Sequence, residues 1–346
     1  LYGTDGAELT TDAYGRVEEC LDRGGGRAEW DAVGDARRVE GVATAYVDAV
    51  LDAVDRERVA AADLTVALDP GHGAGAETSE RLLRRLGCRV VTVNDQPDGT
   101  FPGRDPEPVP ENLDDLRALV RASDADLGVA HDGDADRATF VDETGEAVHG
   151  ATSFAALAAA ALDPGDVAVS AVTVSQRVVD AVEAAGARLE LTPVGSAHIF
   201  SRVRDLEAAG ETVGVAGEGN GGVAFPRYRL ARDGAYVAAR LLERVAETPA
   251  SEAFAPHRGY HALRENLPCP DDATREALLD AAADVATASG ADVTATDGYR
   301  LDYEDGWVLA RASGTEPVVR VYAEARDRDR AAALLDEMVE PLRDAA

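Results

Sequence analysis

The segment HDGDADRATF, residues 131–140, gathers carboxylates in a spacing that could hold a metal ion. Asp132, Asp134 and Asp136 stand at alternate positions, and Arg137 follows them directly. Like charges a few ångströms apart raise one another's pKa or require a compensating cation. Three hard carboxylate oxygens with open positions beside them suit Mg²⁺ held against a phosphate. The spacing therefore predicts a magnesium site, with a solvated acidic turn as the alternative. An EF-hand is excluded because its sixth position requires glycine, and here that position is Arg137.

A second candidate loop is the glycine-rich segment GEGNGG at 217–222. Glu218 and Asn220 lie one residue apart at the end of an apolar stretch, and they offer acceptors and donors on one side, as sugar hydroxyls require. A flexible hairpin is the alternative. The glycines of DPGHGAG, at 69–75, predict a sharp turn from a strand into a helix, and His72 alone does not indicate catalysis.

The third candidate loop, RASGTEP at 311–317, combines a guanidinium, two hydroxyls and a glycine that lets backbone N–H groups face outward. A phosphate dianion requires such a set of donors, and a second arginine a few residues later could add another pair of guanidinium N–H donors. The alternative is an ordinary β-turn. The predicted phosphate-binding residues are Arg311, Ser313, Gly314, Thr315 and Arg320.

The elements around these loops follow from apolar periodicity. Strand, turn and helix alternate twice along the chain, which predicts two α/β units of related construction, and a helix-and-strand pattern of α+β type follows from about residue 256. The acidic loop comes at the end of an apolar strand, where open α/β sheets bind their ligands. The expected helices are 12–22, 39–54, 78–86, 110–123, 151–162, 176–185, 197–209, 233–246, 272–288 and 328–343.

Composition limits the class of protein. The chain has 346 residues with 65 Asp and Glu against 34 basic residues, all of them Arg, and a formal charge of −31. Such a surface repels nucleic acid and fits a cytoplasm rich in salt, where screening shortens the repulsion. Three widely spaced cysteines predict no disulfide framework and a reducing, cytoplasmic location. The longest apolar run, 151–162, is too short to cross a bilayer, so no membrane partner is expected.

The order DPGHGAG, DGDADR, GEGNGG, RASGTEP resembles the α-D-phosphohexomutases, the family of phosphoglucomutase and phosphomannomutase. FPGRDPEPVPENL and DGWVLARASGTEPVVRVYAEA extend the resemblance over essentially the whole chain. It implies a multi-domain α/β fold with a C-terminal α+β domain like the TATA-binding-protein sheet. The expected domains are 1–60, a remnant of domain 1; 61–162, with the metal loop; 163–256, with the sugar loop; and 257–346, with the phosphate loop.

The resemblance also implies the chemistry, in which a phosphoserine exchanges its phosphoryl group with O6 or O1 of a hexose phosphate through a hexose 1,6-bisphosphate. Asp132, Asp134 and Asp136 would hold one Mg²⁺ beside the phosphoserine, and Arg137 would steady the transferring group. The sugar hydroxyls would meet Glu218 and Asn220. The phosphate that is not reacting would bind the residues of the third loop. A monomer or homodimer is expected.

Two features depart from the family pattern. No Ser-His-Asn-Pro occurs in the sequence, and LYGTDGAEL at residues 1–9 resembles the segment just after that serine loop, so the nucleophile is expected to be missing along with most of the first domain. Gly222 stands where some bacterial members have histidine, which leaves the general acid and base open. The expected activity is phosphomannomutase and phosphoglucomutase. The alternatives are phosphoglucosamine mutase and an inactive fragment that binds sugar phosphate or a divalent ion.

Overall fold

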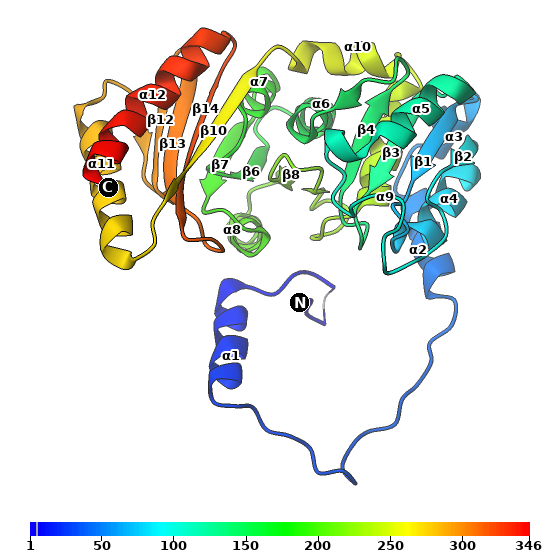
Figure 1. Cartoon of the computed structure of the whole chain (residues 1–346). Coiled ribbons are helices and arrows are strands. Elements are labelled where there is room, and N and C mark those ends of the chain that lie inside the picture. The colour runs from blue at the N-terminus through cyan, green and yellow to red at the C-terminus, as the bar shows by residue number, and fades with distance from the viewer. Residues whose placement is uncertain (5) are drawn as a thin grey trace.

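A computed structural model describes residues 1–4 and 6–346. Its helices and strands form three sheets in a row, with the second sheet in the middle and the N-terminal segment below it in Figure 1. This is a mixed α/β fold of several domains, as the sequence predicts. None of the helices within the described residues combines the length and apolarity needed to span a bilayer.

The first sheet has the strand order β2-β1-β3-β4-β5, in which β1, β2 and β3 are parallel and β4 and β5 are antiparallel additions. All five residues of β1, of β3 and of β4 are buried, because helices cover both faces. The strands are β1 (Thr65–Asp69), β2 (Arg89–Thr92), β3 (Leu127–His131), β4 (Ala138–Asp142) and β5 (Ala147–Val148). The helices of this part are α2 (Val42–Asp52), α3 (Arg56–Ala61), α4 (Gly75–Arg85), η1 (Pro110–Asn112) and α5 (Asp114–Ser123).

The second sheet repeats the construction of the first, with the order β7-β6-β8-β9 and an antiparallel last strand. This confirms the predicted repeat of two α/β units. The strands are β6 (Val167–Ala171), β7 (Arg188–Thr192), β8 (Val213–Gly217) and β9 (Val223–Ala224). The helices are α6 (Gly150–Ala161), α7 (Gln176–Ala184), α8 (Ser196–Ala208), α9 (Gly234–Val245), α10 (Ala250–Phe254) and η2 (Ala255–His257).

One apolar core joins these two sheets. It contains Leu68 and Val129 from the first sheet and Ala168 and Val215 from the second, together with side chains of α6 and α9. The alanine-rich α6 is buried along most of its length, because small side chains let neighbouring elements approach it closely. The shared core therefore holds the loops of the first sheet in a fixed position relative to those of the second.

The third sheet is fully antiparallel, with the order β10-β14-β13-β12-β11, and it has a core of its own under two long helices. Val308, Val319 and Leu334 belong to that core. The strands are β10 (His261–Pro268), β11 (Asp292–Thr294), β12 (Tyr299–Tyr303), β13 (Gly306–Ala312) and β14 (Val318–Ala325). The helices are α11 (Asp272–Ala288) and α12 (Arg328–Ala345).

The seam between the second and third sheets is largely polar. Arg300 is 1% exposed, lies over the ring of Trp307, and donates from Nη1 to the carbonyl oxygens of Val172 and Val174 at 2.7 and 2.8 Å. The carboxylate of Glu324, also buried, accepts from the Ser175 hydroxyl at 2.7 Å and from a backbone N–H at 2.8 Å. Arg300 also forms an ion pair with Asp302 at 2.9 Å, whereas the Glu324 carboxylate is satisfied by hydrogen bonds from neutral groups, so both buried charges have polar partners.

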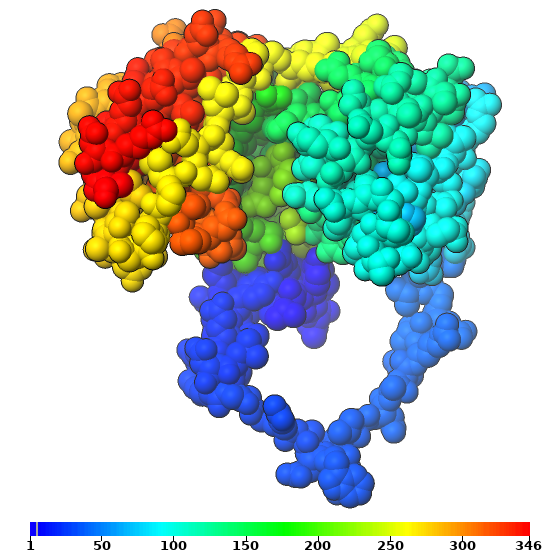
Figure 2. All heavy atoms as spheres, viewed as in Figure 1, coloured from blue at the N-terminus to red at the C-terminus, as the bar shows by residue number. Residues whose placement is uncertain are grey.

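The N-terminal segment lies against the second sheet's helix α8. Helix α1 (Thr11–Asp22) contacts α8, and the Thr11 N–H donates to the Ser201 hydroxyl at 3.3 Å. Residues 23–41 form no helix or strand, and Figure 2 shows this stretch looping away from the rest of the molecule. Trp30 is 87% exposed within it.

Candidate functional site

The predicted metal ligands lie in the hairpin loop between β3 and β4. Each of the three aspartates offers a carboxylate oxygen within 4.8 Å of the others, with Asp132 buried, Asp136 half-buried and Asp134 exposed. Ala135 has φ +60°, a left-handed conformation, and its N–H donates to the Asp132 carbonyl at 3.2 Å. This tight turn lets alternate carboxylates converge on one point.

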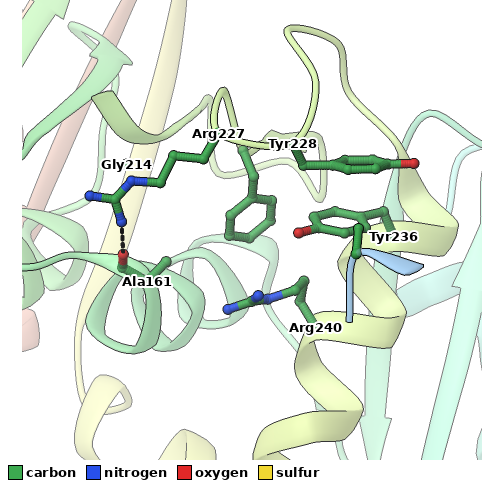
Figure 3. Close-up of a pocket in the computed structure, with 8 residues that line it drawn as sticks. Ala161, Gly214, Arg227, Tyr228, Tyr236 and Arg240 are labelled. Atoms are coloured by element: carbon green, nitrogen blue, oxygen red, sulfur yellow. Dashed lines mark hydrogen bonds between the residues drawn. The ribbon is translucent and has the colours of Figure 1, made fainter. Parts of the chain in front are cut away.

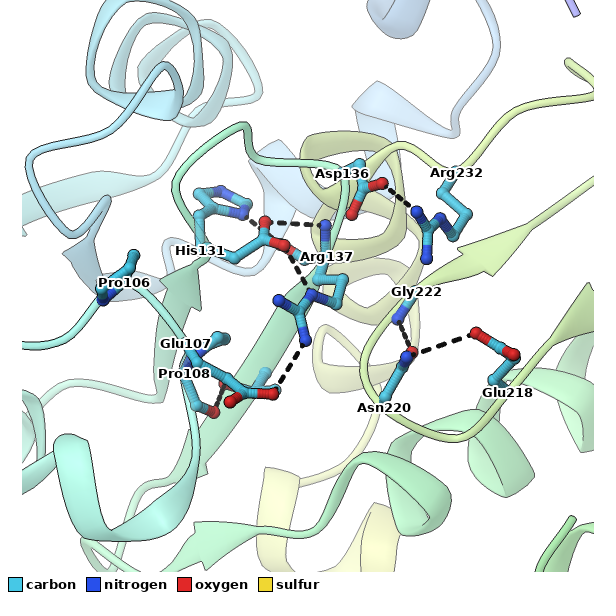
Figure 4. A network of polar contacts seen from close by, with 12 residues as sticks. Pro106, Glu107, Pro108, His131, Asp136, Arg137, Glu218, Asn220, Gly222 and Arg232 are labelled. Carbon is cyan, nitrogen blue, oxygen red and sulfur yellow. Dashed lines mark hydrogen bonds and ion pairs between the residues drawn. The ribbon is translucent and has the colours of Figure 1, made fainter. Parts of the chain in front are cut away.

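Two arginines neutralise the outer carboxylates of this loop. Arg137 Nε donates to Asp132 Oδ2 at 2.5 Å, and Arg232 Nη2 lies 2.5 Å from Asp136 Oδ2 (Figure 4). Burial, with the charges of the other two aspartates, raises the pKa of Asp136 to about 6 against the opposing effect of Arg232. A site whose carboxylates repel one another in this way fits a divalent cation, and its oxygen ligands fit Mg²⁺.

A buried ion pair lies beneath the metal loop. Arg104 Nε donates to Asp69 Oδ2 at 2.7 Å, and Arg104 Nη2 donates to the carbonyl of His131, the residue just before the first metal-loop aspartate, at 2.7 Å. Asp69 also accepts from the backbone N–H of Gly71 at 2.8 Å. The pair therefore connects the end of β1 to the end of β3 and fixes the position at which the metal loop begins.

The predicted sugar-binding residues follow β8. Glu218 Oε1 accepts from the Gly195 N–H at 3.0 Å, and Asn220 Oδ1 accepts from the Gly222 N–H at 3.0 Å. The Gly221 carbonyl accepts from the N–H of Ala138, the first residue of β4, at 3.0 Å. The sugar loop is thus joined directly to the strand that leaves the metal loop.

A cavity of about 220 Å³ lies beside these two loops, where Arg137 and Asn220 line it but none of the three aspartates does. Glu107, Arg137, His149 and Asn220 are among the residues that line it. A larger hollow of about 380 Å³ is lined by Arg227, Tyr236 and Arg240 among others (Figure 3). The larger hollow includes none of the predicted site residues, and its arginines are already paired with carboxylates. The smaller cavity is therefore the candidate site.

The predicted phosphate-binding residues lie on the third sheet. Arg311, the last residue but one of β13, stands opposite Arg320 on β14, so the two side chains leave the sheet on the same face. Nε of Arg311 donates to Asp297 at 3.0 Å, and Arg320 Nη2 donates to Glu316 at 2.5 Å. Between the strands, the Ser313 hydroxyl accepts from the N–H groups of Thr315 and Glu316, and a side chain at Gly314 would meet open space. Residues 314–317 are exposed, so the turn lies on an open surface.

Comparisons with known proteins agree over nearly the whole chain. Family models described as phosphoglucomutase/phosphomannomutase alpha/beta/alpha domain II, alpha/beta/alpha domain III and C-terminal domain match residues 44–145, 149–258 and 265–340. A phosphoglucomutase/phosphomannomutase of Thermococcus kodakarensis is 38% identical over 92% of this chain and 69% of its own length. The chain belongs to the phosphoglucomutase/phosphomannomutase family. The family resemblance read from the motifs is therefore confirmed.

Two further members of this phosphohexomutase family are similar to the chain. A protein of Methanopyrus kandleri named a probable phosphoglucosamine mutase is 35% identical over 99% of this chain and 75% of its own length. The crystal structure of a phosphoglucomutase/phosphomannomutase family protein from Burkholderia thailandensis has a TM-score of 0.84 and 28% identity, and the alignment covers 98% of this chain and 71% of that one. The fold of the phosphohexomutases is thus present.

The structure brings some of the predicted residues of this phosphohexomutase chain together and leaves others apart. The metal and sugar loops adjoin, but among residues 1–4 and 6–346 no hydrogen bond or ion pair joins either of them directly to residues 311–320. Three charged residues near these loops belong to no predicted site: Arg232, Asp297 and Glu107, whose Oε1 lies 3.3 Å from Nη1 of Arg137. Asp297 precedes a glycine in a turn, a weak signal, whereas Arg232 gives no signal in the sequence.

Proposed function

We propose that residues 1–346 form the metal-, sugar- and phosphate-binding part of a phosphohexomutase that transfers a phosphoryl group between O6 and O1 of a hexose phosphate. The observation that carries the proposal is the junction of the metal and sugar loops through Ala138 and Gly221, beside a cavity of about 220 Å³ that Arg137 and Asn220 line. Three clustered carboxylates beside a sugar-type loop suit phosphoryl transfer to a hydroxyl better than hydrolysis of a polymer or hydride transfer.

In this proposal Asp132, Asp134 and Asp136 hold one Mg²⁺. Mg²⁺ bound there would withdraw negative charge from the transferring phosphoryl group. Arg137 is half-buried and anchored on both sides by carboxylates, so its guanidinium is oriented to steady the same group.

The sugar and the second phosphate bind to the other two loops. Glu218 and Asn220 accept and donate hydrogen bonds to the sugar hydroxyls, and their orientation is fixed by the backbone of Gly195 and Gly222. The non-reacting phosphate binds the donors of the third sheet, which are Arg311, Ser313, Gly314, Thr315 and Arg320. A hexose 1,6-bisphosphate is the intermediate, and its two phosphates would occupy the metal loop and the phosphate loop at the same time.

The nucleophile is not among these residues, because no Ser-His-Asn-Pro loop occurs in the sequence. Metal and phosphate ligands stabilise a transferring phosphoryl group only when a donor oxygen is held in line with it. We therefore infer that residues 1–346 bind the substrate without turning it over. A non-catalytic sugar-phosphate-binding protein is the alternative.

Two classes of hexose phosphate are candidate substrates. The similarity to a phosphoglucomutase/phosphomannomutase favours glucose and mannose phosphates, and the similarity to a probable phosphoglucosamine mutase favours the 2-amino sugar. We also propose that the protein is cytoplasmic, since its three cysteines are unpaired, and adapted to high salt, since its formal charge is −31. A monomer or homodimer is the proposed oligomeric state.

Calorimetry with glucose 1-phosphate and Mg²⁺ tests the proposal. We expect measurable binding that is lost in Arg311→Gln, and no interconversion with glucose 6-phosphate even when glucose 1,6-bisphosphate is added. Glucosamine 1-phosphate in the same titration separates the two substrate classes. Turnover by residues 1–346 alone would refute the inference that the nucleophile is not among them. Absence of binding to every hexose phosphate would refute the proposed function.

A further inference from the structure

Asp297 lies in the turn between β11 and β12, where the chain changes direction sharply. The next residue, Gly298, has φ +78°, and a Cβ added there would lie 2.1 Å from the carbonyl oxygen of Ala310. Only glycine fits such a close approach of two backbone segments. The turn therefore holds the Asp297 side chain, which is 20% exposed, against the end of β13.

A single oxygen of Asp297 accepts two hydrogen bonds from different parts of the molecule. Asp297 Oδ2 lies 3.0 Å from Nε of Arg311, on the third sheet, and 3.0 Å from the N–H of Val194, in the loop between β7 and α8. The ion pair is largely buried, with the Arg311 side chain 9% exposed. A charge-assisted hydrogen bond of this kind fixes the orientation of a guanidinium.

Asp297 holds Arg311 by a hydrogen bond from Nε, and the two Nη atoms of Arg311 take no part in that bond. Within the described residues neither Nη atom of Arg311 has a hydrogen-bond partner, so both remain available to a ligand. Two parallel N–H donors are the arrangement that binds phosphate in a bidentate manner. Asp297 thus holds the guanidinium by one edge and leaves the other edge free.

The backbone on the other side of Asp297 leads to the sugar loop. Val194 donates to Asp297, and the next residue, Gly195, donates to Glu218 Oε1 at 3.0 Å. Two consecutive N–H groups therefore hold one carboxylate from the third sheet and one from the sugar loop. This gives a short path from Arg311 to Glu218 that crosses the seam between the second and third sheets.

We propose that Asp297 is a positioning residue that orients Arg311 for the phosphate and, through the backbone of Val194 and Gly195, sets its position relative to Glu218. The inference rests on the proposed function, because it gives Arg311 a phosphate and Glu218 a sugar hydroxyl. A hexose phosphate is a rigid ligand of fixed length, so the spacing of the two sites decides how well both ends bind at once.

Other contacts hold the two sheets together without Asp297. Buried Arg300 and Glu324 cross the same seam and make four hydrogen bonds to backbone and side-chain atoms of the second sheet. Loss of the Asp297 charge therefore changes the orientation of the phosphate loop and leaves the assembly of the sheets in place. Asp297→Asn, which keeps the size of the side chain, is the appropriate variant.

Asp305→Asn is a matched control. Asp305 lies in the turn between β12 and β13 of the same sheet and accepts from Nε of Arg330 at 2.8 Å, but its side chain is 59% exposed and, among the described residues, no hydrogen bond or ion pair joins it to the phosphate loop. Both variants and the unaltered protein are titrated with inorganic phosphate and with glucose 1-phosphate, in Mg²⁺, by calorimetry. The thermal midpoint of each variant is measured alongside.

In Asp297→Asn the affinity for inorganic phosphate should fall about tenfold, and the affinity for glucose 1-phosphate about a hundredfold, because the second ligand also needs the correct spacing. Asp305→Asn should change neither. Equal losses for the two ligands would refute the link to the sugar loop, and affinities like those of Asp305→Asn would refute the positioning role altogether.

A double substitution gives a second, independent measurement. Glu218→Gln should weaken glucose 1-phosphate binding less in the Asp297→Asn background than alone, because the spacing that Glu218 depends on is already lost. Additive effects would contradict the coupling. If the unaltered protein binds phosphate but not glucose 1-phosphate, the proposed function fails, and the phosphate titration still decides whether Asp297 orients Arg311.

Discussion

Replacement of Arg104 by alanine should destabilise the protein strongly, because it leaves a buried carboxylate without its partner. The side chains of Arg104 and Asp69 are 5% and 0% exposed, and Nε lies 2.7 Å from Oδ2. Removing one member of a buried ion pair costs about 3–5 kcal/mol, a large fraction of the roughly 5–15 kcal/mol that stabilises a typical domain. The backbone carbonyl of His131 also loses its donor, which adds to the cost.

The comparison variant is Arg85→Ala. Arg85 makes a shorter contact with Asp48, at 2.5 Å, but the two side chains are 38% and 50% exposed, and a surface pair contributes only about 0–1 kcal/mol. Thermal unfolding followed by circular dichroism should place the midpoint of Arg104→Ala roughly 6–20 °C below that of Arg85→Ala. Midpoints within about 2 °C of each other would refute the reasoning that burial decides the strength of these pairs.

Three further outcomes are expected. Asp134→Ala should weaken Mg²⁺ binding in a calorimetric titration tenfold or more, about 1.4 kcal/mol, whereas exposed Asp115→Ala should not; equal effects would contradict a site at 132–136. The thermal midpoint should rise as KCl goes from low to molar concentration, since salt screens the repulsion of a chain of charge −31, and a flat or falling midpoint would contradict salt adaptation. Burial raises the pKa of Asp142, but hydrogen bonds from Thr144 and Arg258 outweigh it, so its pKa lies below the ordinary value. The stability that Asp142 contributes should therefore be present above about pH 4 and lost as pH falls further, and Asp142→Asn should reduce this loss in urea unfolding.

Periodicity predicted most helices closely, for reasons visible in the structure. The helix expected at 272–288 is α11, and it begins where expected because the Asp271 side chain accepts from the Thr274 N–H at 2.8 Å. Helix α4 begins at Gly75, three residues before the expected start, because Gly75 packs against the ring of His131 and a glycine adds nothing to an apolar pattern. Strand β10 was not expected, since most of its residues are exposed at the edge of the sheet.

Some residues of the candidate site were predictable from local sequence, and others were brought there only by packing. The carboxylates at 132–136 and the donors at 311–315 are local motifs, so their proximity followed from sequence spacing alone. Arg232 meets Asp136 across 96 positions, because the first turn of α9 packs on the metal loop, where the Gly234 N–H donates to the Ala135 carbonyl at 3.0 Å. A contact of that kind depends on how separate elements pack, and no single segment carries a signal for it.

The separate core of the third sheet determines where the protein can open. In the proposed function, a bisphosphate intermediate would present first one end and then the other to the metal, and a molecule of that size would turn only if one wall of the site withdrew. The two sheets that carry the metal and sugar loops share a continuous apolar core, so parting them would expose that core to water. The third sheet meets the second mainly through hydrogen bonds, with the Arg326–Asp180 ion pair and a small apolar cluster of Val172, Trp307 and Leu309, and water can replace the polar contacts. Entry, reorientation and release of the ligand are therefore expected to proceed by swinging residues 261–346 as a rigid unit, with the phosphate loop carried on the moving part.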